Sequence, residues 1–138
     1  MITIVFCLVR KDDVSREDFQ RYWWDEHGPL VARYAETLRI REYHQLHTRT
    51  SPVADALRQS RGTRETEFDG VALVWLDSLE DLIAAASTPE GQAAGQALLE
   101  DEQRFIDMSK AVVWLADDRP VVAESGTGGG RRGGVETG

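Results

Sequence analysis

Residues 19–31 read FQRYWWDEHGPLV, and this stretch decides the fold. From Phe19 to Leu38, apolar and aromatic residues recur at steps of three and four, and His27 stands on the same stripe. This spacing predicts a long helix with one face against a core. Pro29 removes the amide that would bond the Asp25 carbonyl and should push Gly28 away from helical angles, so we expect a kink beside His27.

The segments around this helix predict a sheet. Capping residues followed by helix-forming sequence predict helices that begin after Ser15, Ser51, Ser78 and Thr88. Runs of β-branched and aromatic residues predict strands at residues 2–9, 40–47, 71–76 and 110–116, with a further edge segment at Val121 and Val122. The first run is apolar on both alternating faces, as in a central strand covered on each side.

The order strand, helix, strand, strand, helix, strand predicts an α+β domain with the ferredoxin-like βαββαβ arrangement. A sheet that carries helices on one face and is apolar on both needs a second cover, so we expect a homodimer in which two sheets form a dimeric α+β barrel. We assign residues 1–122 to this domain. Residues 123–138 hold seven of the twelve glycines, and we expect them to form a disordered tail.

The charge balance narrows the range of partners. Lys and Arg number 16 against 24 Asp and Glu, which gives a formal net charge of −8. Nucleic acid and anionic membranes are therefore not expected to bind. The single Cys7 and the absence of a signal-peptide pattern favour a cytoplasmic protein.

His27 is the leading candidate for a site residue, because it is titratable and lies on an otherwise apolar stripe. Two interpretations stay open on spacing alone: a buried histidine bonded to a carbonyl, or a general acid or base in a cleft between sheet and helices. Tyr43 and His47 share one strand face with Gln45 between them, so they are further catalytic candidates; a solvent-facing strand edge is the alternative.

Three tryptophans and one acid are candidates for substrate binding. Trp23 and Trp75 fit a core or a pocket wall, and Trp24 lies off the stripe, where an interface is equally suitable. Asp69 precedes a strand and can orient a histidine, although Asp69-Gly70 is also an ordinary turn signal. No spacing of ligands indicates a metal, and no phosphate-binding loop indicates a nucleotide, so we expect neither metal nor cofactor.

These residues also carry a family resemblance. The stretch at 19–31 resembles the helix motif of the EthD family, with an aromatic pair, His27, a small residue and a proline; Tyr43 to His47, Asp69-Gly70 with Trp75, and Phe105-Ile-Asp107 are similar to later family segments. The resemblance implies a dimeric α+β barrel and a site role for His27. The family often has an acidic residue near the position where this chain has Leu73. The third strand is therefore not expected to supply a carboxylate partner for His27.

Three functions follow as hypotheses. The first is a cofactor-independent enzyme of the cyclase, isomerase or decarboxylase kind, acting on an aromatic, polyketide or lactone substrate through His27. The second is a cofactor-free monooxygenase. The third is a non-catalytic dimeric module that binds a small hydrophobic or aromatic ligand for a neighbouring pathway enzyme.

Overall fold

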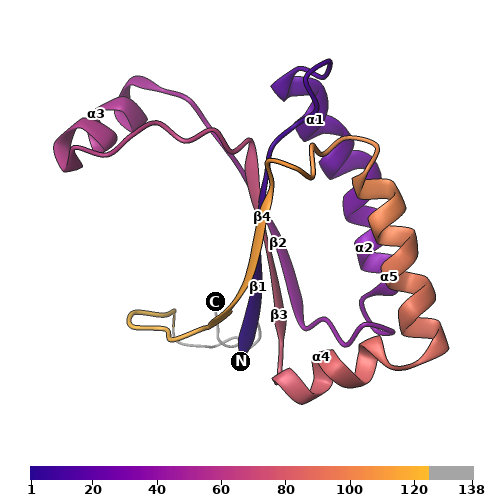
Figure 1. Cartoon of the computed structure of the whole chain (residues 1–138). Coiled ribbons are helices and arrows are strands. Elements are labelled where there is room, and N and C mark those ends of the chain that lie inside the picture. The colour runs from indigo at the N-terminus through magenta and orange to yellow at the C-terminus, as the bar shows by residue number, and fades with distance from the viewer. Residues whose placement is uncertain (125–138) are drawn as a thin grey trace.

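The computed structural model describes residues 1–124, and these form one antiparallel sheet with helices on one face (Figure 1). The sheet has the order β2-β3-β1-β4. Its strands are β1 (Ile2–Leu8), β2 (Glu42–His47), β3 (Gly70–Leu76) and β4 (Val112–Asp117). The predicted ferredoxin-like α+β fold is therefore confirmed. Of the predicted tail at 123–138, all but the first two residues lie outside the described part of the chain.

The helices on the covered face are α1 (Arg16–Tyr22), the π-helix η1 (Trp23–His27), α2 (Gly28–Tyr34), α4 (Leu79–Ala86) and α5 (Pro89–Glu102). The predicted helix starts are confirmed, because each cap side chain accepts a hydrogen bond from the backbone three residues later. The caps are Ser15, Ser78 and Thr88, with Ser51 doing the same for α3 (Pro52–Arg61). Such a bond satisfies one amide that the first helical turn leaves free.

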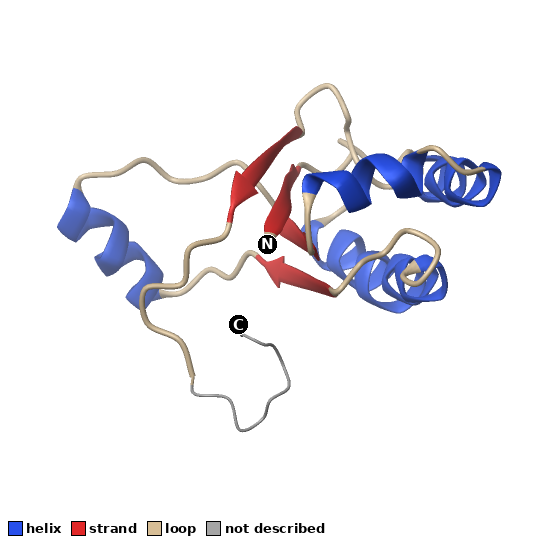
Figure 2. Cartoon of the chain, turned by 90° about the horizontal axis from the view of Figure 1, so that it is seen from below, coloured by secondary structure: helices blue, strands red, loops and turns tan. Residues whose placement is uncertain are grey.

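The helix α3 stands apart from the other helices. It lies beyond the opposite face of the sheet in both views (Figures 1 and 2), and none of its residues is buried. Gly62 ends it in a left-handed conformation with φ of 68°, which glycine adopts without strain. An isolated helix of this length is marginal in water, so α3 has the form of an arm that needs a further surface.

Three local predictions were wrong. Gly28 keeps helical angles, with φ −55° and ψ −51°, because the chain absorbs Pro29 by forming the wider π-turn just before it. The long helix ends at Tyr34 and not at Leu38. Val121 and Val122 form no strand; both are 93% exposed.

The core joins helix to sheet through Trp23. Its side chain is 1% exposed and packs with Phe19, Leu8 and Phe105. A Cβ atom on Gly70 would overlap the Trp23 ring and lie 2.9 Å from the carbonyl oxygen of Leu46. Glycine at the start of β3 is therefore what allows the indole to approach the sheet.

We expect Gly70→Ala to destabilise the protein by about 1–3 kcal/mol, because both the ring and the backbone must move to admit the methyl group. Gly95→Ala is the matched control: a Cβ there meets no atom within 4 Å. It should raise the free energy of unfolding by about 0.4–1 kcal/mol, as alanine restricts the unfolded chain. Urea denaturation measures both; equal stability of the two variants would contradict the proposed contact.

Candidate functional site

A cavity of about 440 Å³ lies between the sheet and its helices. The sheet supplies apolar side chains from alternate positions of β1 and β3, and α2, α4 and α5 supply most of the rest. Five lining residues carry polar side-chain atoms: Trp23, His27, Tyr43, Gln92 and Glu102. This combination of an apolar wall with a few polar groups is typical of small-molecule sites.

The π-helix η1 directs His27 into this cavity. Phe19, Trp23, His27 and Val31 are spaced at steps of four, and in a regular α-helix such residues drift around the axis by about 40° per step. The wider π-turn, closed by the amide of Gly28 on the carbonyl of Trp23, offsets this drift. His27 is consequently buried, with 4% of its surface exposed.

Two carboxylates at the end of α5 flank the His27 ring. The Nδ1 atom lies 2.8 Å from Oδ2 of Asp101, and the Nε2 atom lies 3.7 Å from Oε2 of Glu102. A hydrogen bond from Nδ1–H to the Asp101 carboxylate fixes the neutral tautomer whose Nε2 accepts protons. The second distance is too long for a hydrogen bond, so Nε2 stays available to another molecule.

Burial shifts both groups toward their neutral forms. It lowers the pKa of His27 below 6.5, although Asp101 acts in the opposite direction. Burial, together with the charge of Asp101, raises the pKa of Glu102 from 4.5 to about 7. Near neutral pH the cavity thus holds a neutral imidazole beside a carboxyl group that is protonated in part, which is the condition for a base and an acid to act together.

Asp101 is held in place by a second donor. The hydroxyl of Tyr22 donates to its Oδ1 atom over 2.5 Å, and burial followed by this hydrogen bond raises the pKa of Tyr22 to about 12. The tyrosine stays protonated at all ordinary pH values. It therefore orients the Asp101 carboxylate without competing for a proton.

Among the predicted site residues, Trp23 and Tyr43 line the cavity together with His27. The side-chain amide of Gln45 donates to the Tyr43 hydroxyl over 3.0 Å and to the Trp23 carbonyl over 2.8 Å. Burial raises the pKa of Tyr43, so its hydroxyl is neutral at physiological pH.

His47 does not line the cavity. Its ring stacks on Trp23 with centroids 4.5 Å apart, and its Nε2 atom lies 2.8 Å from the Gln45 side-chain oxygen. Its pKa is lowered by burial. His47 therefore contacts Trp23, which lines the cavity, but does not line the cavity itself.

The other two predicted tryptophans also lie elsewhere. Trp24 is 66% exposed and lines a separate groove beside Pro29 and Tyr43. Trp75 is on the opposite face of the sheet, where its Nε1–H donates to Asp118 over 2.8 Å. Neither residue lines the cavity with His27.

Asp69 is fully buried and does not line the cavity. Its carboxylate accepts the backbone amide of Arg10 at 2.8 Å and the side chains of Arg10 and Arg16 at 2.7 and 2.8 Å. Burial alone would raise its pKa, but these hydrogen bonds hold the pKa below the usual value. Asp69 therefore ties β3 to the start of the first helix and orients no histidine.

Sequence reasoning missed Asp101 and Glu102. A usable signal was present for Glu102, since it follows Gly91, Gly95 and Leu98 at steps of four, three and four and precedes Phe105. A titratable residue on an otherwise apolar helix face is a candidate site residue, as it is for His27. Nothing in the sequence showed that Asp101 would meet the other ring nitrogen.

Within residues 1–124, no cluster of three or more potential ligands is placed to hold a metal ion. In the same part of the chain, no helix combines the length and apolarity that crossing a membrane requires.

The fold and the site together define a ferredoxin-like α+β domain with a cavity between sheet and helices. The sequence pattern described as the EthD domain matches residues 11–109, which is more than half of the chain. The protein belongs to the EthD family.

Solved structures support the same fold. An ethyl tert-butyl ether D (EthD) family protein from Bacillus halodurans C-125 is 18% identical, with a TM-score of 0.57, covering 86% of this chain and 100% of that one. A dimeric protein of ferredoxin-like fold from Bacteroides fragilis NCTC 9343 is 14% identical, with a TM-score of 0.53 and coverages of 85% and 95%. SnoaB from Streptomyces nogalater, described as a cofactor-independent oxygenase, is 13% identical, with a TM-score of 0.52 and coverages of 89% and 97%.

The raised pKa of Glu102 makes stability depend on pH. Because the folded protein binds this proton more tightly than the unfolded chain, the stabilisation is complete below about pH 4.5 and is lost as pH rises through about 7. We expect Glu102→Gln to reduce the loss of stability between pH 5 and pH 8 by on the order of 2 kcal/mol.

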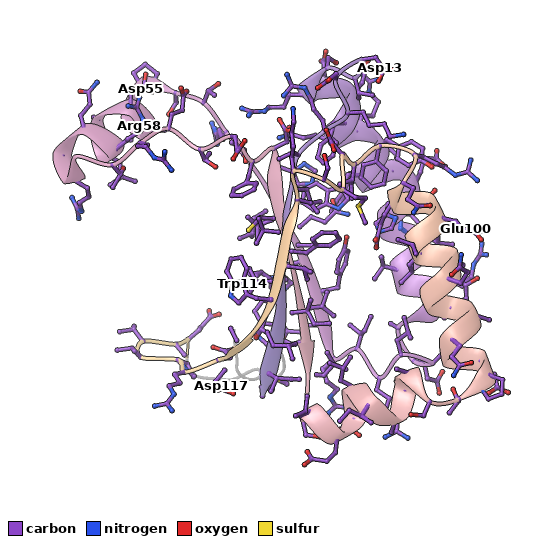
Figure 3. The ribbon with its side chains drawn as sticks, in the orientation of Figure 1. Asp13, Asp55, Arg58, Glu100, Trp114 and Asp117 are labelled. Atoms are coloured by element: carbon purple, nitrogen blue, oxygen red, sulfur yellow. The ribbon has the colours of Figure 1, made fainter. Side chains whose placement is uncertain are left out.

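Urea denaturation at the two pH values measures this difference. Glu100→Gln is the matched control, because Glu100 points away from the sheet on the outer side of α5 (Figure 3). A Glu102→Gln variant with the same pH dependence as the Glu100→Gln variant would show that Glu102 does not hold a proton in the cavity.

Proposed function

We propose that the cavity is the active site of a cofactor-independent enzyme that moves protons on a small carbonyl compound. The observation that carries the proposal is the His27 ring between Asp101 and Glu102, at the edge of an apolar cavity. One ring nitrogen is held by a carboxylate, and the other faces a carboxyl group whose pKa is about 7. An oriented base beside a weak acid is the arrangement that general acid–base catalysis needs.

The proposed step balances within these residues. Nε2 of His27 takes a proton from a carbon next to a carbonyl group, and the electron pair of that C–H bond forms a carbon–carbon double bond. The carbonyl oxygen gains the proton of Glu102, with the Tyr43 hydroxyl as a second hydrogen-bond donor. The imidazolium that forms is stabilised by the adjacent Asp101 carboxylate.

This chemistry suits the substrate classes expected from the sequence. Enolisation followed by return of the proton at another carbon is an isomerisation, and attack of the enolate carbon on a second carbonyl closes a ring. We therefore favour an aromatic, polyketide or lactone substrate and a reaction of the isomerase or cyclase kind. A reducing, cytoplasmic setting suits the single Cys7, which is a buried thiol.

Exchange of carbon-bound hydrogen for deuterium tests the proposal without knowledge of the natural substrate. In D₂O, the protein should accelerate exchange at the central carbon of 1-phenyl-1,3-butanedione, followed by proton NMR. We expect His27→Asn to reduce the rate by at least about 100-fold and Tyr43→Phe by less. The rate should decline as pH rises through about 7, where Glu102 loses its proton.

His44→Asn is the control for this assay, because His44 lies on the opposite sheet face beside Trp75. The His44→Asn variant should catalyse exchange at the wild-type rate. Equal rates for His27→Asn and the wild type would reject the proposed role of His27.

A second candidate function is a cofactor-free oxygenase, which the description of SnoaB favours. Oxygen uptake with a bound aromatic substrate would distinguish it from proton transfer alone. A purely binding role would give ligand binding with neither exchange nor oxygen uptake.

We also propose that the protein acts as a homodimer through the sheet face that carries no helices. Alternation places Val5 and Leu73 on this face, and Trp114 pairs directly with Val5. Trp114 points away from the helices (Figure 3), and all four residues from Val112 to Leu115 are at least 45% exposed. A second copy is the occupant we favour, since similar structures are described as dimeric and the α3 arm extends on the same side (Figure 1).

Trp114→Glu should convert the dimer to a monomer, because it places a charge in the apolar face. Sedimentation equilibrium measures the mass against the 15.5 kDa of one chain. Ile83→Glu, at an exposed apolar site on α4, should leave the dimer intact. A dimeric, folded Trp114→Glu protein would place the interface elsewhere.

A further inference from the structure

Two glycines of α5, Gly91 and Gly95, line the cavity but differ in what surrounds them. A Cβ atom on Gly91 would overlap the carbonyl of Ala85, so the close approach of α4 and α5 requires glycine there. A Cβ atom on Gly95 would meet no atom within 4 Å. Packing therefore does not require glycine at position 95. Glycine inside a helix also costs about 1 kcal/mol of stability relative to alanine, so its presence there needs another explanation.

The position of Gly95 identifies the mouth of the cavity. Among the lining residues, Ala86, Gln92 and Gly95 are exposed. Ala86 ends α4, Gln92 lies near the start of α5, and Gly95 lies halfway along α5. His27 and Trp23, by contrast, are almost completely buried. The cavity therefore opens beside the end of α4 and the first half of α5, and Gly95 forms part of the edge of this opening.

The groups proposed to move protons lie near the C-terminal end of α5. Glu102 is seven residues beyond Gly95, which corresponds to roughly 10 Å along the helix. Leu98 lies between them, and Ile4 and Val74 line the cavity from the sheet. A molecule that reaches Glu102 from the mouth must therefore cross an apolar passage of about this length.

The lining also restricts the charge of that molecule. No lysine or arginine is among the described residues that line the cavity, and its one carboxyl group belongs to Glu102, beside Asp101. An anion would be buried without a cationic partner and next to a second acid, which is strongly unfavourable.

We infer that the cavity takes an electrically neutral, elongated molecule, which enters with its carbonyl or hydroxyl group first and leaves an apolar tail at Gly95. The assignment of the inner end rests on the proposed function. Gly95 acts as a specificity-determining residue, because any side chain there would occupy the space of the tail.

Binding of 4-alkylphenols tests this inference by isothermal titration calorimetry. Affinity should rise by up to about fourfold per methylene from 4-ethylphenol toward 4-octylphenol, as each CH₂ leaves water. The anion 4-octylbenzoate should bind at least tenfold more weakly than 4-octylphenol. Equal affinity for these two compounds would overturn the inferred neutrality.

Substitutions of Gly95 test the position of the tail. Gly95→Leu should keep the affinity for 4-ethylphenol within about twofold and lose at least tenfold for 4-octylphenol, with Gly95→Ala between it and the wild type. Ala93→Leu adds the same side chain at an exposed position outside the cavity and should bind both phenols as the wild type does. Unchanged binding of 4-octylphenol by folded Gly95→Leu and Gly95→Ala would overturn the inference.

Failure of the proposed chemistry can be recognised separately. His27→Asn should lose deuterium exchange and still bind 4-octylphenol, since the tail contacts are intact. If exchange proves independent of His27 while Gly95→Leu still discriminates by length, the binding inference stands without the catalytic one. If exchange depends on His27 while Gly95→Leu binds 4-octylphenol as tightly as the wild type does, the proposed chemistry stands and the inferred position of the tail is wrong.

Discussion

The seating of Trp23 against Gly70 is the contact on which the rest of the structure depends. The indole fixes the distance between helix and sheet, because glycine at the start of β3 lets it approach the backbone. The backbone carbonyl of Trp23 accepts the amide of Gly28, which closes the π-turn, and also accepts the side-chain amide of Gln45 from β2. One residue thus sets the depth of the cavity, the direction of His27 and the position of the strand that carries Tyr43.

The electrostatics of the site follow from sharing one carboxylate between two donors. Asp101 accepts from Tyr22 and His27, so its charge is satisfied on both oxygens while it stays close to the cavity. That charge then acts on Glu102, whose ionisation it opposes. The three groups are interdependent: the order imposed on Asp101 determines which ring nitrogen of His27 is free and how readily Glu102 gives up a proton.

Much of the fold could be predicted from the sequence, because its signals are local. The caps at Ser15, Ser78 and Thr88 and the stripe that contains His27 depend on neighbours within a few residues. The π-turn was missed because a proline only predicts a disturbance, and tertiary packing of Trp23 decides its form. The pairing of His27 with Asp101 spans 74 positions, and the ion pairs of Asp69 with Arg10 and Arg16 also join distant segments, so no local pattern reveals them.

The π-turn also constrains how the gene can vary. It is equivalent to one extra residue in an otherwise regular helix, and helices with such turns are rarer than regular ones. From Trp23 to Gly28, five residues make the rotation that four make in a regular α-helix, so loss of one residue from this turn would restore regular hydrogen bonding and keep the helices on either side in phase. Loss of one residue from a regular part of α1 or α2 would instead turn everything beyond it by about 100° around the axis. The length of the helix should therefore vary among relatives inside Trp23–His27 more readily than on either side of it.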